Sequence, residues 1–114
     1  MVYSVFGALD FTDPHTLLPA LAHTLRPGGR LAMSTLAHYR GGDAPESDVR
    51  CAAIPVRYAD GTRSTLHRWV LDVLVWHKLL DTHGFDVTDT ETVADPGDEH
   101  GPPMTTTVLG AVRR

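Results

Sequence analysis

The side chains that could bind metal or move protons are mostly histidines, and their spacing favours no metal site. The 114-residue sequence has seven histidines, and His77 and His83 lie six apart in one expected helix, off a common face. His38 and Tyr39 follow an expected strand, where they could exchange protons or line a pocket; the alternative is a solvated loop. Cys51, the single cysteine, has no lysine or histidine next to it in sequence, so we expect an inert thiol.

The composition indicates one globular domain spanning residues 1–114. Hydrophobic residues make up 42% of the sequence, which excludes a disordered chain, and one cysteine excludes an intrachain disulfide. The net charge is −4 and no basic cluster exceeds two residues, which argues against nucleic acid or an anionic membrane as partner. No apolar stretch approaches the ~20 residues of a membrane span. We therefore expect a cytoplasmic protein, and nine arginines against one lysine favour a high-GC bacterial genome.

The elements that must position these side chains begin with a short strand and a leucine-rich helix. Asp13 could cap this helix, with Pro14 at its first position. Alternatively, Thr16 is the cap, which places Pro19 in the first turn, where a proline costs little. We expect the second arrangement, with the helix ending near residue 25.

The stretch LRPGGRLAMS at 25–34 predicts an abrupt change from helix to strand. Pro27 prevents continuation of the helix, and either Gly28 or Gly29 supplies the positive φ that ends it. RLAMSTLA, at 30–37, is apolar on both faces, which is typical of an interior strand in a covered sheet.

The second half of the chain repeats the alternation of strand and helix after a hairpin. The hairpin is expected to turn at Asp60-Gly61. The next helix is expected to begin after Asp72 and to stop at Gly84, with Trp76 on its buried stripe. Two strands follow, separated by an acidic loop. Right-handed crossovers would place both helices on the same face of a largely parallel sheet and leave the other face uncovered.

Three segments together resemble the second half of a class I S-adenosylmethionine-dependent methyltransferase. They are VYSVFGALDFTDPHTLLPALAHTLRPGGRLAMSTL, HRWVLDVLVWHKLLDTHGFDV and TTTVLGAVRR. The resemblance starts in the family's fourth strand and covers almost the whole chain. It implies an α/β fold: a partial Rossmann-like sheet, mostly parallel with an antiparallel last strand, two main helices, and a loop and hairpin insert at 40–70.

The resemblance also implies a cofactor and a substrate side. S-adenosylmethionine would lie along the loop after the first strand, where the contacts would come from Ser4, Phe6 and Gly7. A small-molecule methyl acceptor would meet side chains beyond the second strand and in the insert. These candidates are His38, Tyr39, Arg68 and Trp69, whereas Trp76 is expected in the core. No catalytic residue is identified, because methyl transfer depends mainly on positioning.

The sequence departs from the family pattern in its cofactor-binding half. It has no glycine-rich loop between a first strand and a helix, and no acidic residue for the cofactor's ribose. We therefore expect a truncated gene product, a start misplaced at an internal methionine, or half of a split enzyme, and weak or absent cofactor binding by this chain alone. The alternative is a non-enzymatic remnant that dimerises or binds a partner. In either case we expect a homodimer or a separate N-terminal half to cover the open sheet face and the free edge of the first strand.

Overall fold

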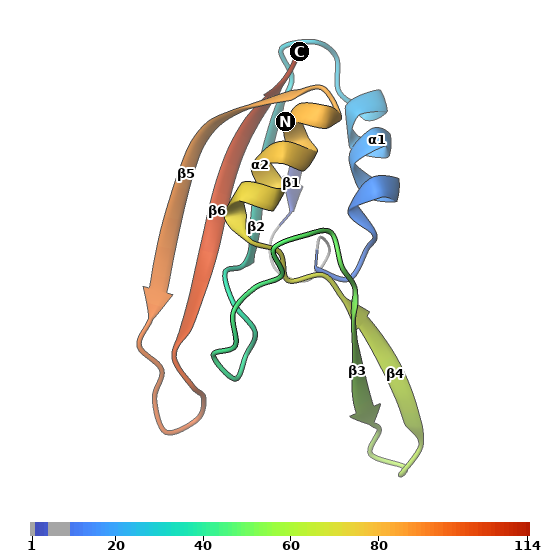
Figure 1. Cartoon of the computed structure of the whole chain (residues 1–114), viewed down its shortest axis with the longest axis vertical. Helices are drawn as coiled ribbons and strands as arrows, with labels where there is room; N and C mark the ends of the chain where they lie inside the picture. The colour runs from blue at the N-terminus through green and yellow to red at the C-terminus, as the bar shows by residue number, and fades with distance from the viewer. Residues whose placement is uncertain (1, 5–9) are drawn as a thin grey trace.

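The computed structural model describes residues 2–4 and 10–114, which form a four-stranded sheet, two helices and a separate hairpin (Figure 1). In chain order, the elements are β1 (Val2–Ser4), α1 (Pro14–Thr24), β2 (Arg30–Leu36), β3 (Ala52–Arg57), β4 (Arg63–Arg68), α2 (Val73–Thr82), β5 (Phe85–Asp95) and β6 (Met104–Arg113). This order is the one predicted from the sequence. No helix in the described ranges is long and apolar enough to cross a membrane.

The main sheet has the strand order β1-β2-β6-β5, and the prediction of mostly parallel strands is wrong. Only β1 and β2 pair in parallel among the described strands, with Val2 opposite Leu31. β6 lies between β2 and β5 and is antiparallel to both. β2 and β5 run in the same direction, as expected. They do not pair with each other, because β6 lies between them and pairs antiparallel with each.

Both helices pack on one face of this sheet, as the handedness of the crossovers predicts (Figure 1). Leu18 of α1 and Trp76 of α2 are fully buried in one cluster with side chains from the facing side of β2 and β6. On the strands, Leu31 pairs with Ala111 in register, and the next pair on this face is Met33 with Leu109, so the four side chains form a continuous floor.

The sheet face opposite the helices is uncovered among the described residues. Ala32 pairs with Gly110 on this face, and both residues are small, so the surface is hollowed there. The radius of gyration is 15.1 Å, whereas a compact chain of this length has about 13 Å. The solvent-accessible surface is 7127 Å², against about 6,100 Å² for a compact protein of this mass. The chain is therefore less compact than an average globular protein of this length.

α1 begins at Pro14 with Asp13 as its cap, so the prediction of Thr16 as cap is wrong. Asp13 Oδ1 accepts the backbone N–H of His15 at 2.9 Å, and Pro14 occupies the first turn. Pro19 is consequently inside the helix and removes one hydrogen bond. Pro19 and His15 are both exposed, so water can reach the His15 carbonyl that loses its partner.

The turn from α1 to β2 uses its two glycines for different reasons. Gly28 has a φ of 85°, so it is the glycine that takes the left-handed conformation. Gly29 has no room for a side chain, since a Cβ would lie 2.9 Å from the Arg26 carbonyl oxygen. Two backbone hydrogen bonds fix the turn against β6: the Gly28 N–H donates to the Arg113 oxygen (2.8 Å), and the Arg113 N–H donates to the Gly29 oxygen (2.9 Å).

Substituting valine for Gly28 or for Gly29 is expected to cost about 1 kcal/mol or more of folding free energy. The first substitution forces a β-branched residue into the left-handed region, and the second drives its Cβ into the Arg26 carbonyl. Thermal melts measure the effect. Gly41→Val is the matched control, because Gly41 has no atom near its missing Cβ and is expected to melt as the wild type does. Unchanged midpoints for both turn variants would contradict this account of the turn.

The β3–β4 hairpin leaves the main sheet and extends away from it (Figure 1). Its turn lies at Asp60-Gly61, as predicted: Gly61 has a φ of 86°, and Asp60 Oδ1 accepts the Thr62 N–H at 2.8 Å. The side chains of β4 are exposed up to its last residue, so this arm contributes little to the core.

Candidate functional site

Three loops gather at the carboxyl ends of β1 and β2 (Figure 1). The Trp69 N–H donates to the Asp10 carbonyl oxygen at 2.7 Å, which joins the segment after β4 to the segment before α1. The Glu46 N–H donates to the Val70 oxygen (2.8 Å), and the Asp72 N–H donates to the Glu46 oxygen (2.9 Å). The carboxyl ends of parallel strands are where α/β sheets bind ligands, so this edge is the candidate site.

Asp10 is the buried acid of this edge. It is 2% exposed, and its Oδ1 accepts the hydroxyl of Thr35 at 2.5 Å. Burial raises the pKa of Asp10 above its ordinary value, although the Thr35 hydroxyl, the nearby Arg68 charge and the Leu36 N–H act in the opposite direction. A carboxyl with a raised pKa at a ligand-binding edge can accept a proton from a bound group.

Our reading of the sequence missed Asp10. The available signal was an acidic residue directly between Leu9 and Phe11, in an apolar segment after the first strand. Its partner Thr35 is 25 residues away, so only the folded chain brings the two together.

Arg68 and Trp69, predicted on the substrate side, both adjoin Asp10. The guanidinium carbon of Arg68 lies 5.1 Å from the centre of the Phe11 ring, in cation–π range. Arg68 Nε is buried and has no hydrogen-bond partner among the described residues. Trp69 binds Asp10 through its backbone, and its side chain packs partly buried against the core.

His38, predicted to contact substrate, has both ring nitrogens engaged. The Thr105 N–H donates to Nε2 at 3.0 Å, so Nδ1 carries the proton and donates to the Tyr39 carbonyl oxygen at 2.7 Å. His38 therefore ties its loop to β6. It also lines a pocket of about 340 Å³ with Arg40, Gly42 and Pro103, among others. Arg40 makes no ion pair with any described residue and is the charged group of that pocket.

Tyr39, the neighbouring candidate, is a structural tie and stays protonated near neutral pH. Its hydroxyl donates to Glu46 Oε1 at 2.9 Å, which closes the loop that follows β2. Burial, together with the hydrogen bond and the charge of Glu46, raises the pKa of Tyr39 to about 12. The four predicted substrate contacts form two separate groups along this edge. Among the described residues, no hydrogen bond or ion pair joins His38 and Tyr39 to Arg68 and Trp69.

The predicted cofactor contacts fall largely outside the described residues. Phe6 and Gly7 lie outside them, and Ser4 ends β1, where it pairs with Met33 of β2. No group of three histidine, cysteine or acidic side chains within the described ranges could hold a metal ion.

Cys51 is exposed, and a histidine lies closer to it than the sequence indicates. The hairpin pairing places His67 Nδ1 3.4 Å from the Cys51 sulfur. The expectation of an inert thiol rested on sequence neighbours alone and missed this contact, because the two residues are 16 positions apart.

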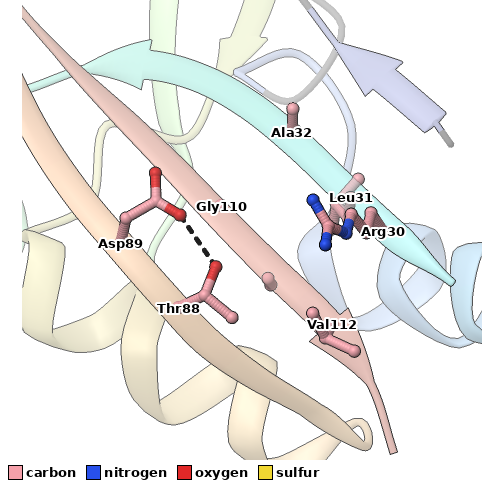
Figure 2. A pocket seen from close by; sticks show the side chains of 8 residues that line it. Arg30, Leu31, Ala32, Thr88, Asp89, Gly110 and Val112 are labelled. Carbon is pink, nitrogen blue, oxygen red and sulfur yellow. Dashed lines mark hydrogen bonds between the residues drawn. The ribbon is translucent and has the colours of Figure 1, made fainter. Parts of the chain in front are cut away.

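A hollow of about 400 Å³ lies on the helix-free face of the sheet (Figure 2). Its floor is made by Ala32 and Gly110, and the side chains of Arg30 and Asp89 lie on either side of Gly110. The Asp89 carboxylate, which accepts the Thr88 hydroxyl at 2.7 Å, occupies the space that a side chain at position 110 would need. A side chain at position 110 would therefore displace the Asp89 carboxylate.

Comparison with known proteins shows the fold. No family model and no curated protein matches the sequence. The glycopeptide N-methyltransferase MtfA complexed with S-adenosylmethionine matches at 19% identity over 99% of this chain and 57% of that chain, with a TM-score of 0.63. An S-adenosylmethionine-dependent methyltransferase from Mesorhizobium loti matches at 20% identity over 97% of this chain and 60% of that chain, with a TM-score of 0.60. Another from Methanosarcina mazei matches at 13% identity over 97% of this chain and 58% of that chain, with a TM-score of 0.65.

The chain thus spans less than two thirds of the length of each of these structures. Identities of 20% or below, with TM-scores of 0.60 to 0.65 over nearly all of this chain, define a shared fold. MtfA is also solved with S-adenosyl-L-homocysteine and with sinefungin. The described residues therefore have the fold of the matched part of these S-adenosylmethionine-dependent methyltransferase structures.

Proposed function

We propose that this chain is the carboxyl-terminal part of an S-adenosylmethionine-dependent methyltransferase that acts on a small molecule. The observation that carries the proposal is the match of 97–99% of the chain to methyltransferase structures, with a buried acid at the ligand-binding edge of the matched sheet. S-adenosylmethionine is the cofactor by resemblance, and it would supply the methyl group. The residues present fit only part of such a site, because the sequence contains no glycine-rich loop after a first strand.

In this proposal Asp10 accepts the proton that the acceptor's nitrogen or oxygen releases as it is methylated. Thr35 holds the carboxyl in place through its 2.5 Å hydrogen bond, and the positive charge of Arg68 acts on the same carboxyl. The Trp69 N–H fixes the backbone of Asp10 at the same edge. Positioning of the two reactants provides most of the rate enhancement, and the base adds to it.

We further propose that another polypeptide segment covers the helix-free face and the free edge of β1. The excess accessible surface and the large radius of gyration support a missing covering layer. β1 is at one end of the strand order, and such an edge offers unpaired N–H and C=O groups. The segment is the N-terminal half of the enzyme or a second copy of this chain. The uncovered face also supports the other candidate function, a non-enzymatic module for dimerisation or partner binding.

The isolated chain is expected to bind S-adenosylmethionine weakly or not at all, because the glycine loop that cradles the cofactor is absent from the sequence. Titration calorimetry on the 114-residue chain measures this, with the polypeptide encoded in frame upstream of Met1 added in a second series. We call that combination the completed enzyme. The proposal expects binding near or below 10 μM, roughly −7 kcal/mol, only for the completed enzyme. A stop codon directly upstream, or no gain on adding the segment, would contradict the proposed function and favour the binding module.

At ~10 μM the chain alone is expected to elute as a dimer or larger species in size exclusion with light scattering. Exposing apolar side chains costs roughly 25 cal/mol per Å², which association recovers. Ala32→Arg, in the hollow, is expected to weaken association if the open face is the contact. Ala53→Arg on the exposed hairpin is the control and should leave the profile unchanged. A sharp monomer peak that binds no apolar-surface dye would contradict the uncovered face.

A further inference from the structure

A second pocket lies between the two helices and the segment 47–49, apart from the edge that carries Asp10. Its volume is about 530 Å³, within the range of roughly 300–1,000 Å³ typical of small-molecule sites. Its lining comes from α1, α2 and the loop between β2 and β3, so three separate parts of the chain converge on it. None of its residues belongs to the proposed methyl-transfer site.

The apolar lining of this pocket contains a leucine that core packing does not explain. Leu74 of α2 lines the pocket and is 70% exposed, more than any other large hydrophobic residue described. It lies off the buried stripe of α2, to which Leu79 belongs. Leu79 and Val49 also line the pocket, and Val49 packs partly buried against the core. These three side chains belong to the apolar part of the lining.

The charged lining contains the single lysine of the sequence. Lys78 lines the pocket and makes no ion pair or hydrogen bond with any residue in the described ranges, so its charge is uncompensated. Asp48 lies on the loop side, where its Oδ1 accepts the Val49 N–H at 2.7 Å. Because Lys78 lies four residues after Leu74 on the same helix, a cation lies beside the apolar lining, which favours a ligand with a single negative charge, and Asp48 repels a second one.

We propose that this pocket binds a small monocarboxylate with an apolar tail. The carboxylate pairs with Lys78, and the tail lies along Leu74, Leu79 and Val49. The proposal does not depend on methyl transfer, because the pocket is built by described residues of this chain alone.

Titration with hexanoate tests the site by NMR, with Lys78 reductively ¹³C-dimethylated so that its charge is kept. As the sole lysine, it gives a single side-chain dimethylammonium signal. We expect a saturable shift of this signal and of α2 amides with a low-millimolar or lower Kd, and at least tenfold weaker binding of hexan-1-ol, hexylamine and adipate. The Lys78→Met variant, followed through its amides, should bind hexanoate about tenfold more weakly.

Matched variants separate the site from general apolar adsorption. Leu74→Ala should weaken hexanoate binding several-fold, whereas Leu66→Ala, on the exposed hairpin, should not change it. Asp48→Asn should strengthen hexanoate binding. The proposal is overturned by the absence of a saturable shift up to 50 mM hexanoate, by equal binding of hexan-1-ol, or by equal effects of Leu74→Ala and Leu66→Ala.

Discussion

Replacing Trp76 with alanine is expected to remove a large part of the folding stability of the chain. Trp76 is fully buried in the cluster that joins both helices to the sheet. Truncating a buried tryptophan costs about 3–5 kcal/mol, which is a large part of a total stability of about 5–15 kcal/mol. Urea melts followed by far-UV circular dichroism measure the loss.

Two other variants make this test specific. Leu74→Ala is two positions away on the same helix but exposed, so it should change stability by less than about 0.5 kcal/mol. Trp76→Phe should cost less than the alanine variant, because phenylalanine keeps most of the buried ring, and the indole Nε1–H that it removes has no hydrogen-bond partner among the described residues. If Trp76→Ala kept the wild-type midpoint, the docking of α2 described above would be incorrect.

Asp10→Asn is expected to act in opposite directions on activity and stability. Methyl transfer by the completed enzyme should fall about 100-fold, because asparagine cannot accept the acceptor's proton. Stability at neutral pH should rise, since the amide oxygen still accepts the Thr35 hydroxyl and no buried charge remains. Such opposition is typical of a strained functional residue.

The stability of the wild-type chain is also expected to fall as the pH rises, because of the same buried carboxyl. Burial raises the pKa of Asp10 above its ordinary value of 3.8, so the native state holds this proton at pH values where the unfolded state has lost it. The stability that Asp10 contributes through this proton is therefore fully present below the pKa of the unfolded state, and it is lost as the pH rises through the raised pKa of the native state. Asp10→Asn should remove this decline from urea midpoints measured across pH 3 to 8. Asp98→Asn, in the exposed β5–β6 loop, is the control, and a loss of both stability and activity in Asp10→Asn would indicate a structural role alone.

The local elements could be read from the sequence because their signals are local. Asp72 caps α2 through its Oδ1, Gly84 takes a φ of 89° at the other end, and the hairpin turns where expected. The sheet order could not be read in this way. Which strand pairs with β2 depends on contacts between residues 70 to 82 positions apart, and the alternating apolar pattern of β6 suits a parallel or an antiparallel partner equally.

In the candidate site, too, some residues could be predicted from the sequence and their partners could not. His38, Arg68 and Trp69 were predicted from their places after strands or in the insert, and the structure adds partners that no spacing rule contains. The backbone N–H of Thr105 engages His38 across 67 residues, and Asp10 joins Thr35 and Arg68 from three different segments. The elements were therefore predictable, whereas the chemistry at their ends required the tertiary fold.

The central place of β6 has a consequence for synthesis. β6 is the last element of the sheet to leave the ribosome, yet it lies between β2 and β5 and supplies partners to both. Until Met104–Arg113 emerges from the exit tunnel, β2 and β5 have no common neighbour and their inner edges stay open. Assembly of this sheet must therefore wait until all of these strands have been synthesised, which lengthens the time during which nascent chains can pair with one another.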